Sequence, residues 1–442
     1  TLINAIEVSP HDPATVYLST TRYKFNDYQP GLYKSTNYGK SWKLITNGIP
    51  VGAYTKVVRE DDVRKDLLFV GTVTGMYASW DGGLNWSPFQ LNLPITPITD
   101  LAISHGNVVV ATQGRSFWIL DDLALLRQYD GTMGKGNLYT PAPTYIANWS
   151  SQLNGEGSDG TSILSGVNPA SGMVLYYDLP VLDEEMEVLL TIKDNNGQIV
   201  DVFSTNEDKD YISYEGNPSR KPIISKKTGL NRFVWDLRYP IMPGIPKVYI
   251  EGSYSGHQVM PGNYHLTLTY DQMRHETMGA LLPNPLFDLS EADYQEYHDF
   301  MNQGEANYTE MTILTNKLHQ ANEKLQALLN EMDTSKQADL MTKGKALSQE
   351  LKQWDELMVQ RLSKAYDDVE NFENGFTAHY LTVINSVDSR IPRITAGAKS
   401  KLVELNGVWW GHKKTGEELL KDKIGGFNQA CQMAGIGAVF VN

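Results

Sequence analysis

Two copies of one sequence motif lie 44 residues apart near the start of the chain. The first copy runs from Gly31 to Trp42 and the second from Gly75 to Trp86, and both contain Ser-x-Asn/Asp-x-Gly-x-x-Trp. Each follows a short run of β-favouring residues that ends at Thr20 or Thr72. A repeat of about 40–50 residues, built from short strands and turns, is typical of the blades of a β-propeller. The repeat therefore predicts a propeller in the first part of the chain.

The copies also differ in length. Thr20 and Thr72 are 52 residues apart, so the first copy carries about eight extra residues, which we place in the polar loop 21–30. A third run, 107–112, continues into 114–120 but lacks the second half of the motif. Residues 1–130 are thus expected to form the last two to three blades of a propeller.

An open set of blades would leave apolar faces and strand edges in contact with water, because closed propellers have about 4–8 blades. We therefore expect the remaining blades to come from the same precursor or from another chain. On this interpretation Thr1 marks a cut through a propeller.

The motif residues are expected to serve turn geometry rather than chemistry. An Asn or Asp side chain accepts hydrogen bonds from nearby backbone N–H groups, glycine adopts positive φ, and tryptophan packs between blades. Catalysis by Asp81 is the lesser alternative. The expected structural residues are Ser35, Asn37, Gly39 and Trp42 in the first copy, and Ser79, Asp81, Gly83 and Trp86 in the second.

The motif resembles the Asp-box of BNR-repeat propellers, and the segment Thr112–Asp122 makes the likeness more specific. Its sequence, Thr-Gln-Gly-Arg-Ser-Phe-Trp-Ile-Leu-Asp-Asp, is similar to the segment that ends the propeller in bacterial sortilin/VPS10-like proteins, often called glycosyl hydrolases. The family has His where this chain has Gln113, which argues against acid–base chemistry there. Arg115, Asp121 and Asp122 are candidates for a ligand-binding cluster near the propeller axis. The alternative is that Arg115 pairs with an acidic neighbour and fixes the last strand.

Composition changes twice after the blades. Residues 131–170 are rich in turn-forming residues and predict a linker or long loops, and 171–285 contain short alternating strands that predict an antiparallel β-sandwich. The segments 229–237 and 261–264 resemble the Ig-like domain that follows the propeller in the same family. Trp235 is expected in the core, whereas His257, His265 and His275 are expected at the surface or in strands.

Residues 286–442 are predicted to form a helical region. Apolar residues recur at spacings of three and four from Leu314 to Met332 and again from Leu340 to Met358, with a break at 333–335. This pattern predicts an antiparallel helical hairpin that packs on other helices, with a partner-recruiting coiled coil as the alternative. Further helices are expected near 365–385 and 395–405. The segment 427–440, in which Cys431 is expected to be buried, resembles the family's C-terminus, so we expect a natural end at Asn442.

The overall fold class expected is therefore mainly β with an α-helical C-terminal region. Composition excludes several functions. The formal charge of −14 and pI near 5.1 argue against binding to nucleic acid or anionic lipid. A single cysteine excludes an internal disulfide framework, and no apolar run approaches the roughly 20 residues of a membrane span. No pattern of metal ligands or cofactor-binding residues is present, so we expect neither a metal nor a cofactor.

Two functions remain open. The favoured one is an interaction module that binds a protein or glycan; the resemblance implies that it is secreted, periplasmic or at the surface of a bacterium. The alternative is a sialidase-like glycoside hydrolase whose catalytic residues lie mostly in blades absent from this chain. A hydrolase needs paired carboxylates, or a tyrosine nucleophile with its acid–base partner, and a sialidase also needs clustered arginines. The first 130 residues show neither pattern, so catalytic residues remain unassigned.

Overall fold

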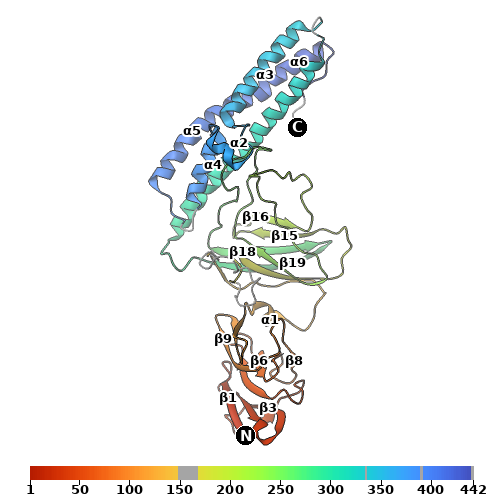
Figure 1. Ribbon diagram of the computed structural model, residues 1–442, viewed down its shortest axis with the longest axis vertical. Helices are drawn as coiled ribbons and strands as arrows, with labels where there is room; N and C mark the ends of the chain where they lie inside the picture. The colour runs from red at the N-terminus through yellow and green to blue at the C-terminus, as the bar shows by residue number, and fades with distance from the viewer. Residues whose placement is uncertain (148–167, 334–335, 389–391, 440–442) are drawn as a thin grey trace. The chain divides into compact units, whose positions relative to one another are not determined.

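The computed structural model describes residues 1–147, 168–333, 336–388 and 392–439. The chain forms two compact units (Figure 1). The first contains residues 1–135 and 139–142, and the second contains 136–138 and 143–442. Part of the expected linker 131–170 and the last three residues lie outside the described ranges.

The first unit consists of three antiparallel sheets that follow one another along the chain (Figure 1). The first sheet has four strands, β1 (Leu2–Val8), β2 (Val16–Arg22), β3 (Asp27–Ser35) and β4 (Lys43–Leu44). The second repeats this order with β5 (Thr55–Glu60), β6 (Leu68–Thr72), β7 (Met76–Ser79) and β8 (Ser87–Pro88). The third contains β9 (Ile98–Ser104), β10 (Asn107–Thr112) and β11 (Phe117–Leu120), and the short helix α1 (Ala124–Gln128) follows it.

These sheets are packed as consecutive propeller blades. Their first strands, β1, β5 and β9, are neighbours in space although each belongs to a different sheet. One apolar core lies between the first and second sheets and includes Tyr17, Leu32 and Trp86. A second core lies between the second and third sheets and includes Phe69 and Ile98. The predicted fold class, mainly β with a partial propeller and a C-terminal helical region, is confirmed.

The two repeated motifs form turns with the same hydrogen bonds. In the first, the Gly39 N–H donates to Ser35 Oγ at 2.9 Å and the Ser41 N–H donates to Asn37 Oδ1 at 2.9 Å. The second repeats these bonds, from the Gly83 N–H to Ser79 Oγ and from the Asn85 N–H to Asp81 Oδ1, also at 2.9 Å each. Gly39 and Gly83 have φ of 79° and 88°, which glycine adopts without strain. These bonds join residues four positions apart, and further bonds join Ser35 to Asn37 and Ser79 to Asp81 within the same turns.

The two motif tryptophans differ in burial. Trp86 is 3% exposed, and its indole N–H donates to the Ile45 carbonyl oxygen of the preceding blade at 2.8 Å. Trp42, at the equivalent position of the first blade, is 40% exposed. Packing between blades therefore holds for Trp86, and the corresponding face of the first blade is open to solvent.

Exchanging Asn and Asp between the two turns is expected to have unequal effects. Asp81 Oδ2 accepts from Asn85 Nδ2, and Asn85 Oδ1 in turn accepts from Asn47 Nδ2. Asp81→Asn would replace the accepting Oδ2 with an N–H₂ group that faces the N–H₂ group of Asn85. Because two donors would then face each other, the substitution should lower the unfolding free energy by about 1–2 kcal/mol. In the first turn Asn37 donates to the Ser41 hydroxyl, which can rotate and donate instead.

Asn37→Asp is accordingly expected to change the unfolding free energy by less than about 0.5 kcal/mol. Urea denaturation followed by circular dichroism measures both variants. Equal losses for the two exchanges would contradict this account of the turns.

The second unit begins with a β-sandwich (Figure 1). One sheet has the order β12 (Asn137–Leu138), β14 (Met173–Leu179) and β17 (Gly229–Trp235). The other has the order β13 (Thr144–Tyr145), β19 (Met273–Leu282), β18 (Gly262–Tyr270), β15 (Val188–Lys193) and β16 (Ile199–Ser204). Trp235 lies fully buried in the shared core, as predicted from the sequence.

Helices form the rest of the second unit. They are α2 (Glu291–Glu331), α3 (Ala338–Met358), α4 (Phe376–Val387), α5 (Ala396–Glu418) and α6 (Ile424–Met433). α2 and α3 pack against each other, as Figure 1 shows, and α4 and α5 pack on α2. Cys431 lies in their common core, where burial raises the pKa of its thiol. No helix in the described ranges is both long and apolar enough to cross a membrane.

The helices depart from the sequence prediction in two places. The segment expected to be helical from residue 365 becomes α-helical only at Phe376, after a short 3₁₀ turn over Tyr366–Glu370. α5 extends well past residue 405 and contains Trp409 and Trp410. Trp409 is 1% exposed and belongs to the core, whereas Trp410 is 65% exposed, because adjacent helical positions face different directions.

Candidate functional site

The blades of the first unit present two opposite ends, which we name by their turns. The loop face carries the β2–β3, β6–β7 and β10–β11 turns, at residues 23–26, 73–75 and 113–116. Backbone hydrogen bonds from Val73 to Tyr54 and from Gln113 to Pro97 place the starts of β5 and β9 at this same end. The opposite end carries the two turns of the repeated motif, and we call it the motif face. Any ligand contacting several blades would meet one of these two faces.

The structure separates the three candidate residues proposed from the sequence. Arg115 is exposed on the loop face, where its carbonyl oxygen accepts from the Trp118 indole N–H at 2.8 Å. Asp121 and Asp122 follow β11 at the opposite end, where the Asp122 N–H donates to Asn107 Oδ1 at 2.9 Å. The four residues of β11 between them span roughly 13 Å, at about 3.3 Å per residue. Arg115 therefore belongs to a different surface from the two aspartates.

An aromatic cluster on the loop face was missed by sequence reasoning. Tyr23 and Tyr54 stack with ring centroids 5.3 Å apart and planes 15° from parallel. Tyr28 lies against Tyr54 with centroids 6.3 Å apart. Tyr23 and Tyr28 belong to the extra loop of the first blade, and they are 40% and 47% exposed. The extra length of the first repeat is the feature of the sequence that could have indicated this cluster.

Two ion pairs, which we call the ionic ladder, join the first strands of the three blades. Arg59 Nη1 on β5 lies 3.5 Å from Glu7 Oε2 on β1, and Arg59 Nη2 lies 2.8 Å from Asp100 Oδ1 on β9. Burial raises the pKa of the Glu7 carboxyl, although the Arg59 guanidinium acts to lower it. A carboxyl with a perturbed pKa is a typical feature of active sites but also of structural ion pairs. Here the carboxylates of Glu7 and Asp100 both contact the Arg59 guanidinium, which links three blades. The ionic ladder therefore has a structural role.

In the second unit, a buried histidine corrects the sequence prediction. His257 was expected at the surface or in a strand, but its side chain is fully buried between the sandwich and α2. Its Nδ1 lies 2.8 Å from Glu305 Oε2, and its Nε2 lies 2.9 Å from His298 Nδ1. Burial and the neighbouring His257 lower the pKa of His298. We call these three residues the histidine cluster.

A second polar network beside this cluster joins the sandwich to the helices. Arg238 Nη1 donates to Asp388 Oδ2 at 2.8 Å and to the Gly256 carbonyl oxygen at 2.7 Å. The Tyr297 hydroxyl donates to Asp388 Oδ1 at 2.9 Å. Although burial acts to lower the pKa of Arg238, Asp388 raises it overall. Arg238, Tyr297 and Asp388 thus all bond to one another or to the backbone, which is typical of a structural network.

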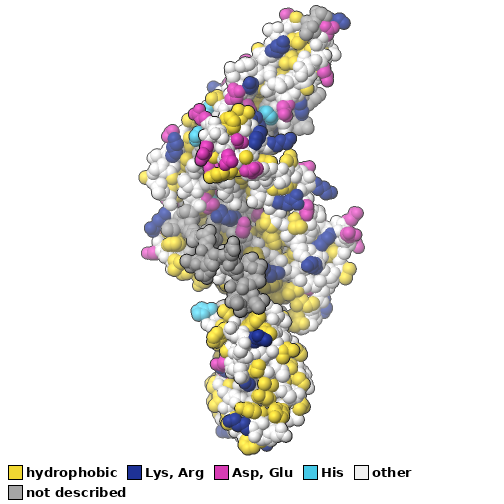
Figure 2. All heavy atoms as spheres, in the orientation of Figure 1, with side chains coloured by type: hydrophobic (Ala, Val, Ile, Leu, Met, Phe, Trp, Pro, Cys, Tyr) yellow, Lys and Arg dark blue, Asp and Glu magenta, His cyan; other side chains and the backbone are white. Residues whose placement is uncertain are grey.

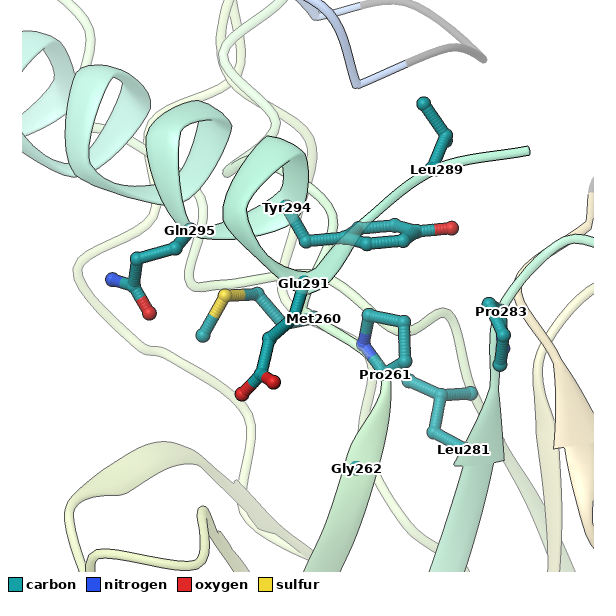
Figure 3. Close-up of a pocket in the computed structure, with 9 residues that line it drawn as sticks. All are labelled: Met260, Pro261, Gly262, Leu281, Pro283, Leu289, Glu291, Tyr294 and Gln295. Atoms are coloured by element: carbon teal, nitrogen blue, oxygen red, sulfur yellow. The ribbon is translucent and has the colours of Figure 1, made fainter. Parts of the chain in front are cut away.

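A cavity of about 400 Å³ lies near the start of α2 (Figure 3). Pro261, Leu281 and Tyr294 give it an apolar surface, and the Glu291 and Gln295 side chains extend along one side (Figure 3). Such a mixture is compatible with a small amphipathic ligand. Among the residues that the structure describes, no group of three or more His, Cys, Asp or Glu side chains is arranged to hold a metal ion.

Fold and surfaces together define an incomplete propeller joined to a sandwich and a helical region. No protein-family profile and no curated protein matches the chain. Similar solved structures include YCF48 bound to a D1 peptide, with 15% identity, 27% of this chain and 36% of that chain covered, and a TM-score of 0.21.

Two further solved structures are also similar to this chain. The GH74 xyloglucanase of Xanthomonas campestris is 14% identical, with 62% of this chain and 38% of that chain covered and a TM-score of 0.23. The extracellular domain of a putative one-component system of B. thetaiotaomicron is 12% identical, with 61% and 30% covered and a TM-score of 0.19. The chain thus spans 30–38% of the length of these three structures. Identities of 12–15% and TM-scores of 0.19–0.23 are too low for these structures to indicate an activity or a ligand for this chain.

Proposed function

We propose that this chain is part of a propeller-based binding module that contacts its ligand, a protein or a glycan, through the loop face. The observation that carries this proposal is the aromatic cluster in which the exposed Tyr23 and Tyr28 contact the half-buried Tyr54. Exposed aromatic rings held in fixed positions are typical of recognition surfaces, because they offer large contact area at little conformational cost. Arg115 lies on this same face and adds a charged hydrogen-bond donor. We propose a secreted, periplasmic or cell-surface location in a bacterium.

The module also needs further blades, from the same precursor or another chain. The open face of the first blade exposes apolar side chains from β1, β4 and the motif turn; they are Ile6 at 62%, Val8 at 57%, Leu44 at 52% and Trp42 at 40%. Figure 2 shows hydrophobic side chains gathered over this unit. Since the equivalent Trp86 is covered by the preceding blade, we propose that another blade covers Trp42 in the same way.

Hydrolysis is not the function that these residues favour. The carboxylates of Glu7 and Asp100 both contact Arg59, whereas a glycoside hydrolase needs one carboxyl group placed to give a proton and another placed to attack or activate water. The exposed side chains of the loop face are suited to contacting a ligand rather than to transferring a proton.

The proposal predicts that ligand retention depends on the loop face. The immobilised chain is incubated with a cell-surface extract, and retained protein and carbohydrate are both quantified. Tyr54→Ala and Arg115→Ala should each reduce specific retention by about tenfold, because each removes a central contact. The control is Tyr38→Ala, which removes an exposed tyrosine from the motif face. Retention that is equal in all variants would contradict the proposal.

A further inference from the structure

The loop that carries Tyr23 and Tyr28 is held rigid by its own hydrogen bonds. The Asn26 N–H donates to the Tyr23 carbonyl oxygen at 3.0 Å, and Asn26 closes this turn with a φ of 59°. The Gln29 N–H donates to Asp27 Oδ1 at 3.1 Å, and Arg22 Nε lies 3.4 Å from Asp27 Oδ2. The extra residues of the first blade therefore form a defined turn.

The segment that carries Tyr54 is fixed by bonds to both neighbouring blades. The Gly52 N–H donates to the Tyr28 carbonyl oxygen at 3.0 Å. The Val73 N–H donates to the Tyr54 carbonyl oxygen at 3.1 Å. Tyr54 is thus positioned between the first and second blades. Burial raises the pKa of its hydroxyl, and the neighbouring Tyr23 and Tyr28 raise it further. The cluster lies where these two blades meet rather than on the open face that carries Trp42.

The geometry of the rings matches one class of ligand. Tyr23 and Tyr54 are nearly parallel, and Tyr23 is 40% exposed, so part of its ring surface is open to a ligand. A pyranose ring has apolar C–H bonds on its face and hydroxyls at its rim. The negative π face of a tyrosine attracts such C–H groups, and polar side chains beside the ring bind the hydroxyls.

Polar groups of the same turn can bind the hydroxyls of a sugar. Arg22 and Asp27 form an ion pair with no net charge, Lys24 is an exposed cation, and the exposed amide of Gln29 follows Tyr28 in the chain. These groups provide both donors and acceptors for hydroxyls. Residues 1–135 contain twelve Lys and Arg against twelve Asp and Glu, so this unit has no net positive charge to attract an acidic polysaccharide or a nucleic acid.

We infer that the cluster of Tyr23, Tyr28 and Tyr54 is a binding site for a neutral glycan chain, which stacks a pyranose ring on Tyr23 and contacts Arg22, Asp27 and Gln29 through its hydroxyls. This inference rests on the proposed function of the loop face and names the ligand class. Phe25, 70% exposed in the same turn, extends the aromatic surface toward the next sugar.

The test uses the full chain and neutral polysaccharides as probes. Native electrophoresis is run through gels that contain mixed-linkage β-glucan, galactomannan or arabinoxylan, and isothermal titration with the matching hexasaccharides gives the affinity. At least one probe should retard the chain. Tyr23→Ala should weaken that affinity at least tenfold, whereas Tyr23→Phe, which keeps the ring, should change it less than threefold. Tyr38→Ala is the control for loss of an exposed tyrosine at the other face, and circular dichroism verifies that each variant is folded.

The outcomes separate this inference from the proposed function. Failure of all three polysaccharides to retard the chain would overturn the glycan assignment, and so would equal retardation of wild type and Tyr23→Ala. If the extract assay still shows retention that requires Tyr54, and protease removes the retained material, the ligand is a protein and the binding module stands. If retention is independent of the loop face as well, both proposals fail.

Discussion

Trp86→Ala is expected to destabilise the first unit by about 3–5 kcal/mol, the usual cost of removing a large buried aromatic side chain. Trp86 is 3% exposed, and it fills the space between the first two blades together with Ile45 and Ile49. The substitution also leaves the Ile45 carbonyl oxygen without the indole donor at 2.8 Å. A loss of this size is a large fraction of the stability of a typical domain.

Trp42→Ala is the matched control for this prediction. The same residue type occupies the equivalent position of the repeat, but Trp42 is 40% exposed, so the expected loss is about 1 kcal/mol. Urea denaturation followed by circular dichroism gives the overall effect, and hydrogen exchange measured by mass spectrometry assigns it to residues 1–135. Equal losses for Trp86→Ala and Trp42→Ala would contradict the packing of the blades described here. In a protein with a further blade over Trp42, the two losses should become similar.

Acidification from pH 7.5 to pH 5 is expected to destabilise the second unit. Burial and His257 lower the pKa of His298, and burial also lowers the pKa values of His319 and His412. An unfolded histidine has a pKa of about 6.5, so over this range the unfolded chain binds more protons than the folded chain. Stability is therefore greatest above about pH 6.5 and falls as the pH decreases, by on the order of 1–2 kcal/mol at pH 5.

Hydrogen-bond geometry gives a second reason for this sensitivity. The facing nitrogens of His257 and His298 are 2.9 Å apart, so they share one proton between them. If both imidazoles were charged, each nitrogen would carry a hydrogen and the bond would be lost. On the other side of the ring, Glu305 Oε2 accepts from His257 Nδ1 at 2.8 Å, so that nitrogen carries a hydrogen. The nearby Asp194 and Asp299 raise the pKa of His298, but their effect is smaller than that of burial.

The measurement is urea denaturation at pH 5, 6 and 7.5, with hydrogen exchange along the first turns of α2. His298→Gln keeps a hydrogen-bonding side chain but removes one titrating group, so its stability should depend less on pH than that of the wild type. His265→Gln is the control for the substitution itself, because His265 lies in β18 rather than on α2. A pH dependence that is unchanged in His298→Gln would exclude His298 as a source of the effect.

Local features of the fold were accessible from the sequence because their interactions span only a few residues. The Ser35–Ser41 turn and its copy are held by bonds between residues two to four positions apart. The hairpin turn at 194–197 and the apolar seams of α2 and α3 are local in the same sense. In such elements the spacing of residue types determines the structure, and the repeat then indicates how sheets follow one another.

The candidate site was different, since its residues come together only through packing between elements. The sequence placed Arg115 near Asp121 and Asp122 because they are close along the chain, but an extended strand holds them at opposite ends of a blade. The stack of Tyr23 on Tyr54 is produced by the length of one turn and by the packing of two blades.

The sequence by itself thus determined the order of the parts: repeated blades, a sandwich built around Trp235, and helices with buried apolar seams. Tertiary structure alone decided which polar and aromatic side chains meet. Arg59 bridges strands of three blades, and His257 contacts Glu305 from 48 positions away. The physical reason is that periodic patterns report which face of an element is buried, whereas a contact between single side chains depends on register and packing that leave no period in the sequence.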